Sequence, residues 1–170
     1  MSRLSHIESK IVSLHQAAQY AEMNRLKNRK VVFTNGCFDV LHLGHITYLA
    51  QAASLGDALF VALNDDPSVR ALGKGEDRPI NPESARAKVL AALGFVDYVV
   101  LFSEPTPLNT ILAIKPDWIV KGGDYDALVS NPSDPRYIVG SVDSAEWGGK
   151  ACTIPLVEGF STTAILSKRG

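Results

Sequence analysis

The chain has 170 residues, of which 46% are hydrophobic and 21% are charged, and its formal net charge is -1. This length and composition fit one compact domain with a sizeable core and leave little room for a second domain. The near-neutral charge argues against a general binder of nucleic acids or membrane surfaces, because such partners demand a clear basic excess.

The hydrophobic runs of the chain are too short to cross a bilayer, which takes roughly 20 apolar residues. Its first residues, MSRLSHIESK, are too polar for a signal peptide. The two cysteines, Cys37 and Cys152, are too few for a disulfide framework. We therefore interpret both thiols as small apolar side chains and expect a protein of the reducing cytoplasm.

The chain begins with a helical pattern. Ser5 and Glu8 form a possible capping box, and apolar residues recur at helical spacing from Ile7 to Ala21. We expect one amphipathic helix that ends near Asn28 and packs on a sheet. Residues 1–28 would then form a helical leader, followed by the main domain over residues 29–170.

Strand patterns and helix patterns then alternate. The expected strands are Val31 to Thr34, Leu59 to Leu63, Tyr98 to Phe102, Trp118 to Val120 and Ala151 to Ile154. The expected helices are Ile46 to Leu55, Glu83 to Leu93, Pro107 to Ile114, Tyr137 to Trp147 and Thr163 to Lys168. This alternation predicts a single α/β domain with a Rossmann-like, doubly wound, parallel five-stranded sheet and flanking helices. Ligands of such sheets bind at the carboxyl ends of the strands.

The first strand leads into the sequence NGCFDVLHLGH, in which His42 and His45 flank Gly44. Gly36 after Asn35 permits a tight turn that brings backbone amides near a ligand, and Gly44 removes a side chain between the histidines. If a helix begins here, both imidazoles lie on one side of its first turn. The unpaired N–H groups and the dipole of that turn favour an anion such as phosphate.

Two other interpretations of the histidine pair stay open. The pair could ligate zinc, although the sequence offers no nearby third ligand of suitable type. The histidines could also be structural residues with satisfied hydrogen bonds.

The sequence HLGH within GCFDVLHLGH resembles the HxGH signature of the nucleotidyltransferase superfamily. A second block, GFSTTAIL at residues 159–166, resembles the C-terminal phosphate-binding segment of that superfamily, although a Ser/Thr run alone is also typical of ordinary helix capping. The segments RPINPESARAKVLAALGFVDYVV, TPLNTILAIKPDWIVKGGDY and EGFSTTAIL are similar to the D-glycero-β-D-manno-heptose 1-phosphate adenylyltransferases. This resemblance covers residues 30–168.

The resemblance implies transfer of AMP from ATP to a heptose 1-phosphate, which gives pyrophosphate and ADP-heptose for the inner core of lipopolysaccharide. It also implies a homodimer and a separate heptose kinase, because many relatives carry a sugar kinase in front of this domain. The attacking phosphate oxygen is already ionised near neutral pH, so we expect positioning and charge stabilisation to supply catalysis without a general base. Mg²⁺ should be bound mainly through the ATP phosphates, without a dedicated protein site.

We predict three groups of site residues. The catalytic residues are His42, His45 and Lys121, of which Lys121 directly follows a strand at the carboxyl edge. The nucleotide-binding residues are Thr34, Asn35, Gly36, Cys37, Phe38, Gly44, Gly122, Gly123, Asp124, Ser161, Thr162 and Thr163. The substrate-binding residues are Asn64, Asp65, Lys74, Arg78, Arg86 and Arg136. Asp39 either orients a histidine or caps the turn, and the lysine and arginine side chains named above could also be ordinary solvated side chains.

Two other functions share some of these sequence features. A glycerol-3-phosphate-type cytidylyltransferase shares the HxGH and Ser/Thr elements, but its signature carries an Arg-Thr pair where this chain has Val157 and Glu158. A non-catalytic nucleotide-binding module would not need both histidines together with the Ser/Thr run. We therefore expect an adenylyltransferase that binds ATP and a sugar 1-phosphate.

Overall fold

The computed structural model describes residues 2–73, 75, 77–162 and 165. Lys74, Thr163 and most of the helix expected from Thr163 to Lys168 lie outside the described residues. None of the helices formed by the described part of the chain combines the length and the apolar character needed to cross a membrane.

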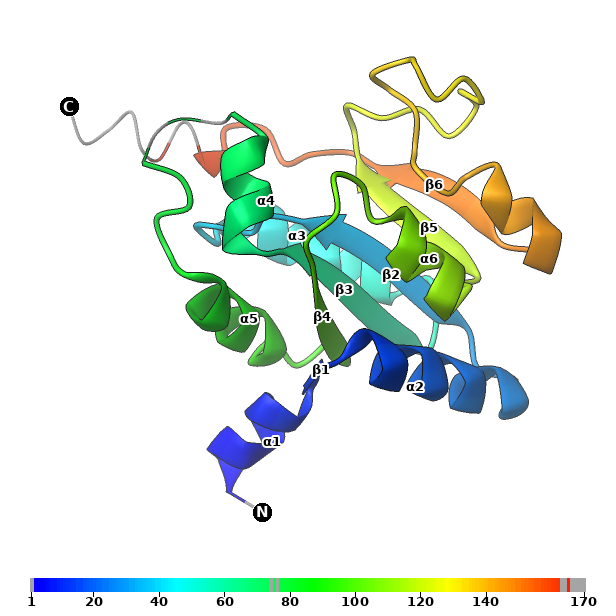
Figure 1. Ribbon diagram of the computed structural model, residues 1–170, viewed down its shortest axis with the longest axis horizontal. Coiled ribbons are helices and arrows are strands. Elements are labelled where there is room, and N and C mark those ends of the chain that lie inside the picture. Colours follow the sequence, from blue (N-terminus) through cyan, green and yellow to red (C-terminus); the bar gives the residue numbers. More distant parts are fainter. Residues whose placement is uncertain (1, 74, 76, 163–164, 166–170) are drawn as a thin grey trace.

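The described residues form a six-stranded parallel sheet in the order β1-β4-β3-β2-β5-β6 (Figure 1). The strands are β1 Ile11–Val12, β2 Val31–Gly36, β3 Ala58–Asn64, β4 Tyr98–Phe102, β5 Trp118–Gly122 and β6 Lys150–Ile154. The α-helices are α1 Arg3–Ser9, α2 Leu14–Leu26, α3 Leu43–Ala53, α4 Asp66–Ala71, α5 Glu83–Ala91 and α6 Leu108–Ile114, and η1 Asp143–Trp147 is a 3-10 helix. The strand order reverses between β2 and β5, which makes this the topological switch point of the sheet.

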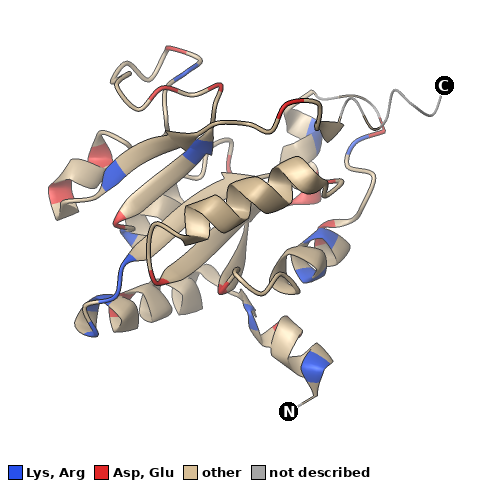
Figure 2. Ribbon diagram, turned by 180° about the vertical axis from the view of Figure 1, so that it is seen from behind, with Lys and Arg blue, Asp and Glu red and all other residues tan. Residues whose placement is uncertain are grey.

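Helices cover both faces of the sheet (Figure 1). Alternate residues of β2 point to opposite faces, so Val32 packs with α3 and α5, whereas Val31 and Phe33 pack with α2 and α6. Viewed from behind, α3 crosses its face of the sheet and carries no charged side chain, while acidic and basic residues are interspersed elsewhere (Figure 2). The doubly wound parallel fold predicted from the sequence is confirmed.

The prediction of one N-terminal helix is wrong, because the chain forms α1, strand β1 and α2 instead. The β-branched residues Ile11 and Val12 pair in parallel with β4 and add a sixth strand at the sheet edge. Ser13 then begins a new helix through a capping box with Gln16. Residues 1–28 thus contribute to the sheet and to its cover, and the boundary at residue 28 stays a prediction.

Three further elements differ from expectation. The helix expected from Tyr137 to Trp147 is reduced to η1, because Gly140 has a φ of 82° that a right-handed helix does not accept. Helix α4 was not predicted, although Asp65 as N-cap followed by Pro67 is a typical helix start. Strand β2 continues through Gly36, so the turn after it lies further along the chain than expected.

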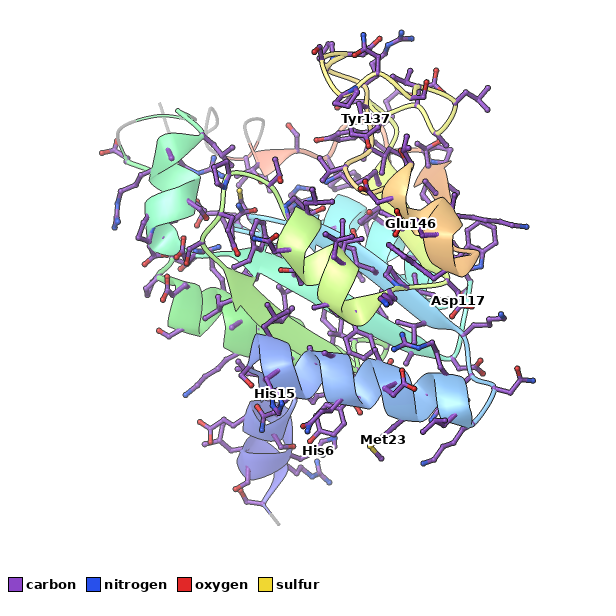
Figure 3. The ribbon with its side chains drawn as sticks, turned by 45° about the vertical axis from the view of Figure 1, so that its right-hand side comes forward. His6, His15, Met23, Asp117, Tyr137 and Glu146 are labelled. Carbon is purple, nitrogen blue, oxygen red and sulfur yellow. The ribbon has the colours of Figure 1, made fainter. Side chains whose placement is uncertain are left out.

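The two edges of the sheet differ in chemistry. At the amino-terminal edge, the carboxylate of Asp117 (Figure 3) accepts hydrogen bonds from the backbone N–H of Val31 and from the ammonium group of Lys30. Asp97 accepts one from the backbone N–H of Leu59 in the same way. These two carboxylates accept hydrogen bonds from backbone N–H groups at the starts of β2 and β3. Ligands of doubly wound sheets bind at the opposite, carboxyl-terminal edge.

A buried hydrogen-bond chain joins α3 to this carboxyl-terminal half of the sheet. The hydroxyl of Tyr48 on α3 lies 2.7 Å from the hydroxyl of Thr34 and donates to the carbonyl of Val120 at 2.9 Å. Burial raises the pKa of the Tyr48 hydroxyl, so it stays protonated and remains a donor.

We expect Tyr48→Phe to lower the free energy of unfolding by about 1–3 kcal/mol, because the substitution leaves two buried oxygens without their partner. Urea unfolding monitored by circular dichroism measures the change. Tyr20→Phe is the matched control, because the hydroxyl of Tyr20 makes no hydrogen bond to a described residue. Equal stability of Tyr48→Phe and the control would contradict the prediction.

Candidate active site

Two neighbouring cavities open at the carboxyl-terminal edge, at the switch point between β2 and β5. The larger has a volume of about 680 Å³ and the smaller about 290 Å³. Five residues line both cavities: Asn35, Gly36, Cys37, Lys121 and Tyr125. The ends of β2 and β5 therefore form a shared wall, as expected for the ligand site of a doubly wound sheet.

The two histidines lie together in the larger cavity. His42 is the N-cap of α3 and His45 lies in its first turn, and their ring centroids are 3.9 Å apart at an interplanar angle of 25°. A Cβ atom at Gly44 would lie 3.0 Å from the His42 ring, so only glycine leaves this ring in place. The expectation that both imidazoles share one side of the first helical turn is confirmed.

The histidine pair is held in its neutral form. Burial lowers the pKa of His42, and burial together with the proximity of His42 lowers the pKa of His45 to about 4. The buried Nδ1 atoms of both rings have no hydrogen-bond partner among the described residues. A hydrogen bond to the backbone of Val40 opposes the lowered pKa of His45 without cancelling it, so His45 is neutral at pH 7. Both histidines line the larger cavity, where a neutral imidazole can form a hydrogen bond with a ligand.

This lowered pKa predicts how stability depends on pH. Unfolded histidine takes up a proton near its ordinary pKa of 6.5, whereas folded His45 takes one up only near pH 4. Between these values the unfolded state binds more protons, so the free energy of unfolding falls as the pH is lowered from about 6.5 toward 4. Urea unfolding at pH 7 and pH 5 should show a smaller loss for His45→Gln than for the wild type. An equal loss would show that His45 does not carry this dependence.

Lys121 lies on β5 in the wall between the cavities. Its Nζ donates a hydrogen bond to Oδ1 of Asn35 at 3.1 Å and lies 4.6 Å from the centroid of the Tyr125 ring. These contacts bring its ammonium group from the end of β5 to the end of β2. The expected location of Lys121 at the carboxyl edge is confirmed.

The two sequence blocks that suggested phosphate binding converge on the larger cavity. Phe160, Ser161 and Thr162 line it opposite the first turn of α3. A Cβ atom at Gly44 would lie 3.4 Å from Cβ of Phe160, so the C-terminal segment contacts the start of this helix closely. More than a hundred residues of sequence separate the two blocks, and the fold places them in one site.

Most residues predicted to bind nucleotide line the larger cavity: Asn35, Gly36, Cys37, Phe38, Gly44, Gly122, Asp124, Ser161 and Thr162. Thr34 does not, because it is fully buried beneath the cavity and bonded to Tyr48. Gly123 also lies outside the lining and packs near the backbone of Pro155 and Leu156. Thr163 is outside the described residues.

The predicted substrate cations occupy different environments. Arg78 lines the larger cavity, where its Nε donates to Oδ2 of Asp39 at 2.6 Å. Arg136 is exposed and pairs with Asp134 and Asp126 in the loop between β5 and η1. Arg136 lines neither cavity, so the structure does not support its assignment to the substrate site. Lys74 lies outside the described residues.

The assignment of Arg86 to the substrate site is wrong, because its side chain is fully buried and lines neither cavity. Its guanidinium donates to the carbonyls of Cys37, Asn64 and Asn81 and forms an ion pair with Asp66. The residue that the sequence indicated as a substrate ligand therefore ties together the loops that follow β2 and β3.

The polar residues after β3 divide into two roles. Asn64 lines the smaller cavity and donates from Nδ2 to the hydroxyl of Ser68 at 3.2 Å. Asp65 lines neither cavity, because its carboxylate caps α4 through the backbone N–H of Ser68 and accepts a hydrogen bond from Ser103. The assignment of Asp65 to substrate binding is therefore corrected to helix capping.

Comparisons with known proteins agree with this geometry. A family model described as cytidylyltransferase-like matches residues 33–167. The chain belongs to the cytidylyltransferase-like family. The D-beta-D-heptose 1-phosphate adenylyltransferase of Bordetella bronchiseptica is 51% identical over 164 residues, which cover 96% of each chain.

Other relatives of this cytidylyltransferase-like chain are longer. The proteins named bifunctional protein HldE from Koribacter versatilis and Geobacter metallireducens are 47% and 46% identical over 95% and 96% of this chain. The chain spans 31% and 32% of their respective lengths, about a third of each. Among solved structures, the lipopolysaccharide core biosynthesis protein from Thermoplasma volcanium has a TM-score of 0.58 and 31% identity, covering 76% of this chain and 97% of that one.

Several residues of this cytidylyltransferase-like site were not predicted. Tyr48, Tyr125, Leu156 and Phe160 line the larger cavity, and Thr106 lines the smaller. Tyr48 belongs to the apolar pattern of α3 and is typical of a core residue, so its sequence context gave no separate signal. Tyr125 directly follows the predicted residues Gly122 to Asp124, and this adjacency could have indicated it.

Proposed function

We propose that the protein transfers AMP from ATP to D-glycero-β-D-manno-heptose 1-phosphate and releases pyrophosphate and ADP-heptose. The main support is the convergence of HLGH and of Ser161 and Thr162 on one cavity that shares a wall with a second. A reaction that joins two phosphorylated substrates needs two adjoining sites. The relative from Bordetella bronchiseptica is named for this adenylyl transfer and covers nearly the whole chain.

In this proposal the larger cavity holds ATP and the smaller holds the sugar phosphate. Asn64 and Thr106 are polar groups of the smaller cavity that suit sugar hydroxyls. Lys121 lies in the shared wall, where it would neutralise charge as the sugar phosphate approaches the α phosphate of ATP. The backbone amides and hydroxyls of Ser161 and Thr162 suit the β and γ phosphates.

His42 and His45 then act as hydrogen-bond donors to the α phosphate. A neutral imidazole has one N–H group and can donate without losing a proton. The nucleophile is an ionised phosphate oxygen that attacks the α phosphorus, and the bond from this phosphorus to the pyrophosphate oxygen breaks. No proton has to move in this step, which matches a histidine pair whose pKa values are lowered.

We further propose that Mg²⁺ is bound mainly through the phosphate oxygens of ATP. Within the described part of the chain, no cluster of three His, Cys, Asp or Glu side chains is arranged to hold a metal ion. Mg²⁺ commonly keeps several waters and binds phosphate oxygens, so the phosphates of bound ATP would suit this ion. Bound there, the ion would screen the charge of the β and γ phosphates.

The proposed substrate bears on the partner enzyme and on the cellular location of the protein. A kinase-type reaction can supply a sugar phosphate, so we propose a functional link to a heptose kinase. A cytoplasmic location agrees with the free thiols of Cys37 and Cys152 and with the supply of ATP. A homodimer stays a prediction, which light scattering after size-exclusion chromatography would test.

The test is a matrix of pyrophosphate-release assays. ATP, CTP, GTP and UTP are each combined with heptose 1-phosphate, glycerol 3-phosphate and phosphopantetheine in the presence of Mg²⁺. We expect the highest kcat/KM for ATP with heptose 1-phosphate. Activity only with CTP would contradict adenylyl transfer, and nucleotide binding without pyrophosphate release from any pair would contradict catalysis.

A further inference from the structure

Asp39, inside the sequence NGCFDVLHLGH, has a carboxylate that is completely shielded from solvent. It accepts hydrogen bonds from Nε of Arg78 at 2.6 Å and from the backbone N–H groups of Ile80 and Asn81 at 2.9 Å. Burial alone would raise the pKa of this carboxyl, but these N–H groups and the Arg78 guanidinium together lower it. Asp39 is therefore an ionised group that substrate does not reach directly.

Arg78 has donors left over after this contact. A guanidinium has five N–H donors, and the bond to Asp39 uses the one on Nε. Within the described part of the chain, neither its Nη1 nor its Nη2 atom donates a hydrogen bond. The side chain lines the larger cavity together with His42 and Ser161 but does not line the smaller one. Its remaining donors thus belong to the nucleotide side of the site.

We propose that Asp39 is a positioning residue, which orients Arg78 so that its two amino groups bind a phosphate of the nucleotide in the larger cavity. A guanidinium held at Nε keeps its planar pair of amino groups in one direction, and this arrangement suits two parallel hydrogen bonds to phosphate oxygens. The identity of the ligand rests on the proposed function. The coupling between Asp39 and Arg78 rests on their contact alone.

Asp39 also holds the backbone that follows Arg78. Besides the two N–H groups, the side-chain amide of Asn81 donates to the backbone carbonyl of Asp39 at 2.7 Å. A purely structural role would therefore be confined to anchoring Ile80 and Asn81. The two roles differ in one respect, because a structural anchor matters whether or not Arg78 is present, whereas a positioning residue matters only when Arg78 is there to be oriented.

The experiment is a double-mutant cycle of Asp39→Asn and Arg78→Ala. The Kd of ATP is measured by calorimetry, and the KM of each substrate by pyrophosphate release. We expect Arg78→Ala to raise the Kd and KM of ATP by about tenfold to a hundredfold, as for a lost hydrogen bond between charged groups, and to leave the KM of the sugar phosphate unchanged. Asp39→Asn should raise the same two constants in the wild-type background and by less than about twofold in the Arg78→Ala background.

Three results would overturn the inference: unchanged ATP constants in Arg78→Ala, an increase confined to the KM of the sugar phosphate, or an equal effect of Asp39→Asn in both backgrounds. Should Asp39→Asn fail to fold, Arg78→Lys replaces it. Lysine keeps the charge but lacks the planar fork, so we expect about the same defect as in Arg78→Ala, and full ATP affinity would refute the orienting role.

Arg25→Ala is the matched control, because Arg25 pairs with Glu22 on α2 and lines neither cavity. It should leave the ATP constants unchanged. A change equal to that of Arg78→Ala would overturn the inference. Because calorimetry with ATP does not depend on turnover, a wild-type protein that binds ATP but transfers no AMP would contradict the proposed function and leave the coupling of Asp39 and Arg78 measurable.

Discussion

His45→Ala should lower the kcat of pyrophosphate release by about a hundredfold to a thousandfold, which is the usual effect of removing one preorganised donor from a developing negative charge. His45 lies in the first turn of α3, where its ring stacks on His42 and meets the edge of Phe38 with ring centroids 5.2 Å apart. These contacts hold the imidazole before substrate arrives. The substitution removes this donor, and His42 would have to move to take its place.

Two further variants separate this effect from general damage. His45→Gln retains a side-chain amide donor and should recover part of the lost rate. His15→Ala removes an exposed histidine on α2 (Figure 3) and should leave kcat unchanged. A rate for His45→Ala within about threefold of the wild type would contradict the assigned role, because even one lost donor costs far more.

Arg86→Ala should have the largest effect on stability and lower the free energy of unfolding by about 3–5 kcal/mol. The substitution leaves the carbonyls of Cys37, Asn64 and Asn81 without their buried donor and leaves Asp66 without its ion-pair partner. When one partner of a buried charged network is removed, the remaining polar groups stay buried without a partner, and this destabilises the folded state. Cys37 and Asn64 both line the smaller cavity, so kcat/KM should fall as well.

Urea unfolding measures this change, and Lys88→Ala on the same helix is the control. Lys88 forms an exposed ion pair with Glu8 at 2.9 Å, and such pairs contribute about 0–1 kcal/mol. Arg86→Lys should be intermediate, because one ammonium group cannot reach all four acceptors of the guanidinium. A loss for Arg86→Ala no larger than that for Lys88→Ala would show that the network does not stabilise the fold.

The sequence was sufficient for the features that depend on local pattern. The strands at residues 31, 59, 98, 118 and 151 were predicted because parallel strands buried on both faces form short continuous apolar runs. The helix expected from Ile46 to Leu55 is α3, which begins three residues earlier at Leu43, so that His42 and His45 lie at its start. Their position at the carboxyl edge then followed from the rule for doubly wound sheets.

The features that depend on contacts between distant residues were not predictable. Nothing local distinguishes Arg78, which lines a cavity, from Arg86, which is buried and donates to the carbonyls of three segments distant in the sequence. The interruption of the N-terminal helix was, in contrast, predictable from the sequence. Ser13 and Gln16 form a better capping box than Ser5 and Glu8, and the β-branched pair before Ser13 favours a strand.

In the proposed reaction, the phosphate of a heptose 1-phosphate attacks the α phosphate of ATP. The most direct measurement follows radiolabel from ATP that is labelled either at the α or at the γ phosphate. With heptose 1-phosphate and Mg²⁺, the α label should appear in a sugar nucleotide and the γ label only in pyrophosphate. A sugar product that carries the γ label, or an α label that never joins the sugar, would contradict adenylyl transfer to the sugar phosphate.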